Sequence, residues 1–317
     1  MAPKVIEKNT IEQIIAQASI SDLLTVIEQA YTNYSNKNAV VPPVGTLTFE
    51  KPPGDVHIKY GYIKGGDNYV IKIASGFYNN PDFGLGSSNG LNLVFNQKNG
   101  LLETILLDEG YLTDIRTAVG GAVAAKYLSP RHINKIGIVG TGIQARLQLE
   151  YISKVISCKD VLVWGRSEGK LQKYRDDMKP HGYNIDVTKE CERITKECNL
   201  IVTTTPSQSP ILKNSGLEEG TLIIAMGADT EGKQELDTNI LEEAALIVPD
   251  SYSQCQHHGE IHKAYQANLL SKVKMKELGE IINDNGFVRR ESDIIIADLT
   301  GIATQDIQIS KYVLDHL

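Results

Sequence analysis

Several residue types and patterns are scarce in this chain of 317 residues, and each scarcity excludes a class of protein. No uncharged apolar run approaches the roughly 18 residues that a membrane span needs, and the polar start lacks a signal-peptide segment. No CxxC pair is present, which excludes a disulfide framework and a zinc ribbon. We expect a cytoplasmic protein with reduced thiols and no membrane partner. The four cysteines are Cys158, Cys191, Cys198 and Cys255.

Positive charge is also in short supply. The chain has 32 Lys and Arg residues against 39 Asp and Glu residues, a net charge of −7, and no basic block. Because a nucleic-acid backbone attracts the opposite balance, we expect no nucleic-acid partner. The segment from Cys255 to His262 invites a zinc interpretation, but ligands so close in sequence cannot readily surround one ion. We predict no metal site.

The first part of the chain has the pattern of a sheet preceded by two helices. Apolar residues recur at helical spacing over 11–34, and Ser21-Asp22 is the expected cap of the second helix. Short alternating segments bounded by turn clusters then predict a largely antiparallel sheet. The expected strands are 46–49, 56–63, 69–74, 91–96 and 103–107.

After an Ala-rich helical stretch the pattern changes near Pro130, and continuous apolar strands then alternate with helices. Such alternation predicts a parallel sheet covered on both faces. The fold class is therefore α/β, with a Rossmann doubly wound parallel sheet domain over 131–302 and an α+β domain over 1–130. A final helix over about 303–317 is expected to pack on the first domain. The strands expected in the parallel sheet are 135–140, 161–165, 199–205, 221–227, 245–250 and 293–299.

A glycine-rich turn is the strongest local signal. The strand ending at Val139 leads directly into G-x-G-x-x-A and then a helix, the arrangement that binds the pyrophosphate of a dinucleotide. Gly140 permits the tight turn, Gly142 lets the backbone approach the phosphates, and Ala145 keeps the helix close to the sheet. A purely structural glycine turn is the alternative. The turn residues assigned to the cofactor are Gly140, Thr141, Gly142, Ile143, Gln144 and Ala145.

The end of the next strand indicates which dinucleotide is bound. An NAD-selective site usually presents Asp or Glu to the ribose here, whereas this chain has Arg166 and Ser167. Charge and hydroxyl donation suit a 2′-phosphate, so NADP(H) is favoured over NAD(H). Alternatively, Arg166 lies over the adenine and is compatible with either cofactor.

With these motifs in place, the chain resembles the ornithine cyclodeaminase/μ-crystallin family over nearly its whole length. The resemblance rests on Lys72 alone in a strand, the T-x-x-R-T-A helix start containing Arg116, the GTGIQA turn and the G-K-x-E-L segment from Gly232. It implies a homodimer in which the N-terminal domains of the two chains pair. The same domain would bind an amino acid or cyclic imine. Lys72 and Arg116 would hold the substrate carboxylate. The alternatives are a solvated strand lysine and a structural ion pair with Asp108, Glu109 or Asp114.

The resemblance also implies roles for Asp229, which would assist a substrate amine, and for Lys233, a substrate-binding residue. The alternative for Asp229 is a cap of the following turn. His57 and Lys59 replace residues usual in cyclodeaminases; His57 would carry a proton and Lys59 would bind the carboxylate, unless both are exposed strand residues. The remaining cofactor-binding assignments are Thr117, Thr204, Thr205, Met226, Gly227, Thr300 and Gly301.

The predicted function is an NAD(P)-dependent cyclodeaminase, an ornithine-like lyase that converts a basic amino acid into a cyclic one with release of ammonia. One alternative is an oxidoreductase of amino acid metabolism, either a ketimine reductase or an amino acid dehydrogenase. A second alternative is a non-catalytic NADP-binding protein. In the two catalytic versions Asp229, Lys72 and His57 are the catalytic candidates, and the cofactor supplies hydride transfer while the protein orients the substrate.

Overall fold

The computed structural model describes residues 2–77, 79–271 and 273–317, apart from the side chain of residue 81. The chain divides into two compact units: unit 1 is residues 1–116 with 302–317, and unit 2 is residues 117–301. The predicted domain limits of 130/131 and 302/303 stay a proposal. Among the described residues, no helix has the length and apolar character to cross a membrane.

Unit 1 is a seven-stranded sheet with helices on one face. The strand order is β1-β7-β6-β5-β4-β2, with β3 pairing β4, and all pairs are antiparallel except β1 with β7. Its strands are β1 (Lys4–Glu7), β2 (Ala39–Val40), β3 (Gly45–Glu50), β4 (Pro53–Ile63), β5 (Asn68–Phe77), β6 (Ser88–Asn96) and β7 (Leu102–Leu107), and the 3-10 turn η1 is Asn80–Phe83.

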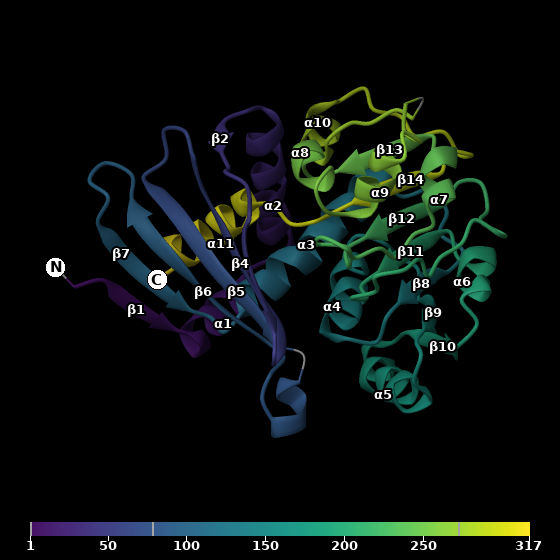
Figure 1. The fold of residues 1–317 in the computed structure, drawn as a ribbon, viewed down its shortest axis with the longest axis horizontal. Helices are drawn as coiled ribbons and strands as arrows, with labels where there is room; N and C mark the ends of the chain where they lie inside the picture. Colours follow the sequence, from purple (N-terminus) through teal and green to yellow (C-terminus); the bar gives the residue numbers. More distant parts are fainter. Residues whose placement is uncertain (1, 78, 272) are drawn as a thin grey trace. The chain divides into compact units, whose positions relative to one another are not determined.

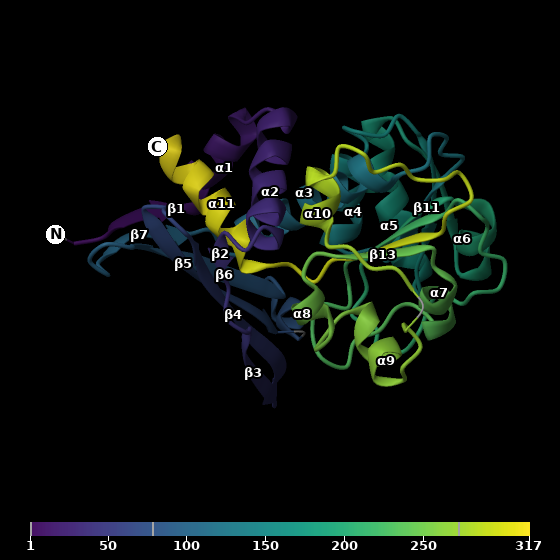
Figure 2. The same ribbon diagram turned by 90° about the horizontal axis from the view of Figure 1, so that it is seen from above.

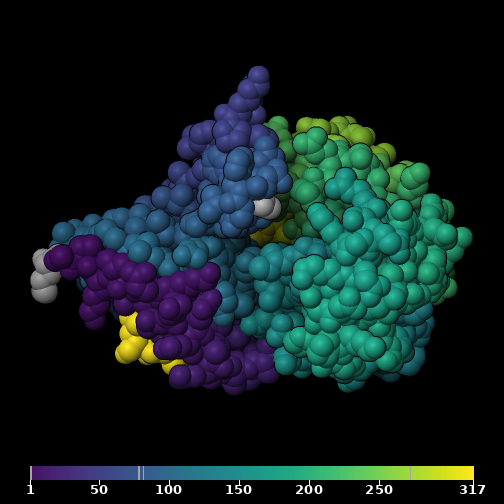
Figure 3. Space-filling view, turned by 90° about the horizontal axis from the view of Figure 1, so that it is seen from below, coloured from purple at the N-terminus to yellow at the C-terminus, as the bar shows by residue number. Residues whose placement is uncertain are grey.

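Helices α1 (Lys8–Gln17), α2 (Ile20–Ser35) and α11 (Ala303–Asp315) cover one face of this sheet (Figure 2). The predicted cap of the second helix at Ser21-Asp22 is wrong, because Ser19 is the N-cap and shares a capping box with Asp22. The tip of the β3–β4 hairpin stands out from the rest of unit 1 (Figure 3). In β3, Leu47 and Phe49 are exposed.

Unit 2 is a doubly wound sheet of seven parallel strands in the order β10-β9-β8-β11-β12-β14-β13 (Figure 1), which confirms the predicted fold class. Its strands are β8 (Ile136–Val139), β9 (Asp160–Trp164), β10 (Asn184–Thr188), β11 (Leu200–Thr203), β12 (Leu222–Ala225), β13 (Leu246–Pro249) and β14 (Ile295–Asp298). Strands β8, β11, β12 and β14 are buried along their whole length, as expected for a sheet covered on both faces.

Helices lie on both faces of this sheet, with α4 and α5 on one side and α7 and α9 on the other (Figure 2). A further helix, α3 (Tyr111–Leu128), contains the boundary between the two units in sequence. The helices are α4 (Ile143–Ile152), α5 (Glu168–Met178), α6 (Glu192–Glu197), α7 (Thr238–Glu243), α8 (Tyr252–Cys255), α9 (Glu260–Gln266) and α10 (Leu278–Asn283), and the 3-10 turn η2 is Lys179–His181.

Candidate dinucleotide and substrate sites

The glycine-rich turn lies between β8 and α4, as the sequence predicts. Gly140 has a φ of +124°, and a Cβ added there would lie 2.6 Å from Oγ1 of Thr204, so a larger residue would be both strained and crowded. Gly142 is the N-cap of α4, and a Cβ at this position would meet no described atom within 4 Å. This open space beside uncapped N–H groups at a helix start fits the pyrophosphate of a dinucleotide.

Arg146, which sequence reasoning missed, supports this turn from within α4. Its Nη1 atom donates to the carbonyl oxygens of Thr141, at 2.6 Å, and Gly142, at 3.0 Å. Its Nη2 atom lies 2.7 Å from a carboxylate oxygen of Asp177, and its guanidinium lies over the ring of Tyr174. Arg146 therefore fixes the carbonyls of the turn, which leaves the N–H groups at the start of α4 for an anion.

Arg166 and Ser167 follow β9, at the carboxyl end of the sheet, and both are exposed. Ser167 is the N-cap of α5, where its hydroxyl accepts a hydrogen bond from the N–H of Lys170 at 3.5 Å. A hydroxyl that accepts in this way still has its own hydrogen to donate. Both residues are thus placed where the ribose of the adenosine half lies in doubly wound folds.

The loops after β11 and β12 contain four of the predicted cofactor residues. Thr204 donates its hydroxyl and its N–H to the carbonyl oxygen of Val139, at 3.1 and 2.9 Å, which ties this loop to the strand before the glycine turn. Thr205 and Gly227 donate their N–H groups to one buried carboxylate, that of Glu235. Met226 donates its N–H to the carbonyl oxygen of Thr203 at 3.0 Å.

Asp229 and Lys233 form an ion pair with a distance of 2.7 Å between Nζ and Oδ1. Asp229 is the more exposed partner, with 46% of its side chain accessible against 16% for Lys233. The two predicted substrate residues of unit 2 therefore lie together, but their charged groups bind each other. A substrate amine that binds Asp229 would have to share its carboxylate with Lys233.

Thr300 and Gly301 follow β14 and are buried. Asp250 accepts from the hydroxyl of Thr300 at 3.1 Å and from the N–H of Gly301 at 2.6 Å, and Gln254 donates to both residues. Thr117 lies in α3, where its carbonyl oxygen accepts from Gln148 at 3.0 Å. These contacts give all three residues a structural task beside the predicted one.

The substrate candidates of unit 1 lie on the face of its sheet that the helices cover. Lys59, Lys72 and Asn92 form one cross-strand row on β4, β5 and β6, and they are 8%, 2% and 2% exposed. Strand alternation thus directs Lys72 away from the face of Ile71 and Ile73, as the sequence predicts. The alternative that Lys59 is an exposed strand residue is wrong.

Arg116 and Lys72 share one carboxylate. Oδ1 of Asp306, in the first turn of α11, lies 3.2 Å from Nε of Arg116, and Oδ2 lies 3.2 Å from Nζ of Lys72. Gln305 accepts a further bond from Nη1 of Arg116 at 3.4 Å and donates to the hydroxyl of Tyr31 at 3.0 Å. The partner of both cations is therefore Asp306, and not an acid of the segment 108–114.

Burial governs the ionisation of this group. It lowers the pKa of Lys72 to about 7 against the opposing attraction of Asp306, and the charges of Arg116 and Lys59 lower it further. Burial alone would raise the pKa of Asp306, but the three cations hold it below its ordinary value. Burial also raises the pKa of Asp108 to about 6 against the hydrogen bond that its carboxylate accepts from Leu112. Lys72 can therefore change protonation state near neutral pH.

His57 has an acidic partner on its own strand. Its Nε2 atom lies 3.2 Å from Oδ1 of Asp55, and both side chains are only about a fifth exposed, at 18% and 20%. Asp55, His57 and Lys59 alternate along β4, so they share the face of the sheet that carries Lys72. The alternative that His57 is an exposed strand residue is wrong, and the pairing with Asp55 was not foreseen.

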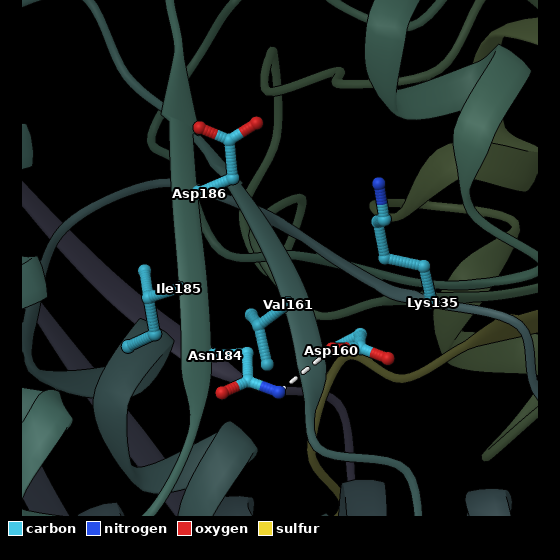
Figure 4. Close-up of a pocket in the computed structure, with 6 residues that line it drawn as sticks. All are labelled: Lys135, Asp160, Val161, Asn184, Ile185 and Asp186. Atoms are coloured by element: carbon cyan, nitrogen blue, oxygen red, sulfur yellow. Dashed lines mark hydrogen bonds between the residues drawn. The ribbon is translucent and has the colours of Figure 1, made fainter.

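A separate pocket lies at the amino-terminal ends of β8, β9 and β10 (Figure 4). Across it, Asn184 donates to Asp160 at 3.0 Å, while Lys135 and Asp186 pair with Glu197 and Arg193. Ligands of doubly wound sheets bind at the opposite, carboxyl ends, so we do not assign this pocket to the cofactor. The pocket has a volume of about 340 Å³ and is lined by Lys135, Asp160, Val161, Asn184, Ile185 and Asp186.

The parallel sheet and its glycine turn define a fold of the dinucleotide-binding class. The chain matches the model of the ornithine cyclodeaminase/mu-crystallin family over residues 5–317, and it belongs to that family. Family members include cyclodeaminases, imine reductases and an alanine dehydrogenase, all of them enzymes.

Two relatives illustrate this range. The chain is 40% identical over 293 residues to the uncharacterized cyclodeaminase y4tK of Sinorhizobium fredii. This match covers 91% of this chain and 88% of that protein. It is 33% identical over 313 residues to the alanine dehydrogenase of Archaeoglobus fulgidus, with 97% and 94% covered.

Solved structures show the same range. An archaeal alanine dehydrogenase dimer with bound NAD superposes with a TM-score of 0.89 at 30% identity, over 100% of this chain and 96% of that one. The iminosuccinate reductase of Paracoccus denitrificans in complex with NAD+ superposes with a TM-score of 0.88 at 26% identity, over 99% of this chain and 95% of that one. A lysine cyclodeaminase superposes with a TM-score of 0.86 at 26% identity, over 100% of this chain and 92% of that one.

Proposed function

We propose that the chain is an NAD(P)-dependent oxidoreductase that interconverts an α-amino acid and the corresponding α-imino acid. The observation that carries the proposal is the buried group of unit 1, in which Lys72 and Arg116 share the carboxylate of Asp306. Three cations act on the single carboxylate of Asp306, because Lys59 adds its charge to those of Lys72 and Arg116. An incoming substrate carboxylate would therefore find positive charge in a setting of low dielectric.

The cofactor proposal rests on the glycine turn. Its N–H groups would hold the pyrophosphate, and the similar alanine dehydrogenase and iminosuccinate reductase structures contain NAD and NAD+. Arg166 and Ser167 are exposed at the end of β9, where charge and hydroxyl donation favour the 2′-phosphate of NADP(H). The nicotinamide, when bound, supplies or accepts hydride at the substrate α-carbon.

The residues of unit 1 supply orientation and proton transfer. Arg116 and Lys72 fix the substrate carboxylate and thereby the direction of its α-carbon. Lys72, whose pKa is lowered to about 7, and His57, paired with Asp55, are placed on one sheet face and can exchange protons with the substrate nitrogen. Lys59 adds positive charge beside the carboxylate, as its buried cross-strand position opposite Lys72 allows.

Cyclodeamination is the second candidate, and Asp229 favours it. In that reaction the α-imine is attacked by the distal amine of a basic amino acid such as ornithine, ammonia departs, and hydride returns to the cyclic imine to give proline. Asp229 follows β12 and would hold the amine, with Lys233 beside it. We place this candidate second because Asp229 already has Lys233 as an ionic partner at 2.7 Å.

One assay distinguishes these candidates. The protein is incubated with NAD+ or NADP+ and with alanine, ornithine, lysine or diaminobutyrate, while ammonia and the absorbance of the reduced cofactor are followed separately. Stoichiometric reduced cofactor supports the proposed oxidoreductase, as does oxidation of NAD(P)H by cyclic imines or by 2-oxo acids with ammonia. Ammonia without reduced cofactor identifies a cyclodeaminase. Tight cofactor binding without turnover of any of these compounds identifies a non-catalytic binding protein.

We also propose a homodimer, because the second face of the unit 1 sheet is apolar. One row across it runs through Tyr60, Ile71, Leu93, Ile105 and Val5, of which Tyr60 is 37% exposed and Val5 49%. An exposed apolar face of this kind marks an interaction surface, and the similar archaeal alanine dehydrogenase is a dimer. Light scattering should give twice the chain mass for the wild type and the chain mass for Tyr60→Asp.

A further inference from the structure

Besides Asp250, which holds Thr300 and Gly301, the described part of unit 2 contains three buried carboxylates that neither the dinucleotide nor the substrate assignment uses: Glu235, Glu260 and Asp298. All three are at most 1% exposed, and each accepts hydrogen bonds from main-chain N–H groups. Burial raises the pKa of Glu235 and of Asp298 to about 7 and that of Glu260 well above its ordinary value. Three acids gathered in one core are costly, which suggests a task that apolar residues cannot perform.

Glu235 joins two loops of the sheet. Its Oε1 atom accepts from the N–H of Thr205 at 2.6 Å, and its Oε2 atom accepts from the N–H of Gly227 at 3.0 Å. Thr205 follows β11 and Gly227 follows β12. A Cβ on Gly227 would lie 2.3 Å from Oε2 of Glu235, so this close contact requires glycine. One carboxylate thus sets the separation of the two loops.

Glu260 and Asp298 hold Glu235 in place. The carboxylate of Glu260, at the start of α9, accepts from the N–H groups of Glu235 and Leu236 at 2.8 and 2.9 Å. Asp298, at the end of β14, accepts from the N–H of Ile261 at 3.0 Å. These hydrogen bonds therefore connect β14, through the start of α9, to the loops after β11 and β12.

The position of these loops indicates which part of the dinucleotide they serve. A doubly wound sheet consists of two mononucleotide-binding halves, and ligands bind at the carboxyl ends of its strands. The turn after β8 and the residues after β9 serve the pyrophosphate and the adenosine. The loops after β11 and β12 belong to the other half, which receives the nicotinamide mononucleotide.

We infer that Glu235, held by Glu260, is a positioning residue that fixes the loops after β11 and β12 for the nicotinamide half of the cofactor. The inference rests on the proposed dinucleotide binding. It assigns Glu235 no contact with the cofactor, because its two carboxylate oxygens are used by Thr205 and Gly227.

Two probes test this inference without an activity assay: NAD+, which has the nicotinamide half, and ADP, which lacks it. Isothermal titration calorimetry is performed with the wild type and with Glu235→Gln. The amide replaces one acceptor by a donor, so one loop loses its hydrogen bond. We expect the Kd of NAD+ to rise roughly tenfold and the Kd of ADP to change less than about twofold.

Asp237→Asn is the matched control, since Asp237 lies in the same segment but caps α7 through the N–H of Asn239. Asparagine caps helices as well as aspartate, so neither Kd should change. If Glu235→Gln does not fold, Glu260→Gln carries the test, with the same direction expected.

Equal losses of NAD+ and ADP affinity would show a merely structural role and overturn the inference, as would no loss of either. If the wild type binds NAD+, NADP+ and ADP all undetectably, the proposed function has failed and the inference fails with it. Selective loss of NAD+ affinity supports both.

Discussion

The Nζ atom of Lys72 lies 3.2 Å from Oδ2 of Asp306, and the other oxygen of the same carboxylate lies 3.2 Å from Nε of Arg116. Asp306 stands in the first turn of α11, where the helix dipole adds to the stabilisation of its negative charge. One acid therefore holds two cations that come from a strand and from another helix, and it sets their separation before a substrate arrives.

Asp306→Asn should destabilise the protein by about 3 kcal/mol, because it leaves two buried cations without their anion. Urea unfolding followed by circular dichroism measures the loss. The control is Asp315→Asn on the same helix, which breaks only the exposed pair with Lys311 and should cost less than about 0.5 kcal/mol. Similar losses in the two variants would contradict the assigned pairing.

The activity should depend on pH through Lys72. Its pKa is lowered to about 7, and only the protonated amine attracts a carboxylate, so kcat/KM should fall as the pH rises through about 7. Lys72→Arg keeps its charge at all these pH values and should lose this alkaline limb, whatever its absolute rate. A limb that persists unchanged in Lys72→Arg belongs to another group.

Arg116→Ala should lower kcat/KM at least tenfold, about 1.4 kcal/mol, because a two-point contact with the substrate carboxylate is lost. The dissociation constant of the cofactor should stay the same, since Arg116 is assigned to substrate alone. Arg131→Ala, which removes an arginine with 91% of its side chain exposed, is the control for general effects of charge. A loss smaller than tenfold would count against the assigned role.

Arg166→Ala tests the cofactor preference. If its guanidinium binds the 2′-phosphate, the variant should lose roughly tenfold more affinity for NADP+ than for NAD+, measured by calorimetry. Lys173→Ala removes another exposed positive charge from the following helix, α5, and should affect both cofactors little. Equal losses of the two cofactors in Arg166→Ala would instead indicate a contact with the adenine.

Local patterns in the sequence predicted the parallel sheet, the glycine turn and the side of the strand on which Lys72 lies, because these depend on residues close together in the chain. They missed β10, whose alternating NIDVT segment is short and partly exposed, and β1, which pairs with the distant β7. The cap at Ser19 was missed because Ser21, which directly precedes Asp22, is also a residue type that caps helices. Neighbouring residues do not decide between such competing local solutions.

The acids that organise the sites were harder to find. Asp306 lies far from Lys72 and Arg116 in sequence, and the only available signal was that it is the sole charge between residues 303 and 310. Glu235 and Asp298 likewise accept hydrogen bonds from main-chain N–H groups of distant segments, and no spacing rule links an acid to a distant N–H. The roles of the predicted site residues stay proposals that the variants above test.

The order of segments in unit 1 has a consequence for biosynthesis. Residues 117–301 form unit 2 and are translated before α11, which belongs to unit 1. Because α11 stands at the end of the chain, the antiparallel sheet lacks this helix, and the anion for Lys72 and Arg116, until the last residues leave the ribosome. The antiparallel sheet, whose strands are made early, therefore keeps an apolar surface uncovered during synthesis, and it is the part of the nascent chain that a chaperone would recognise.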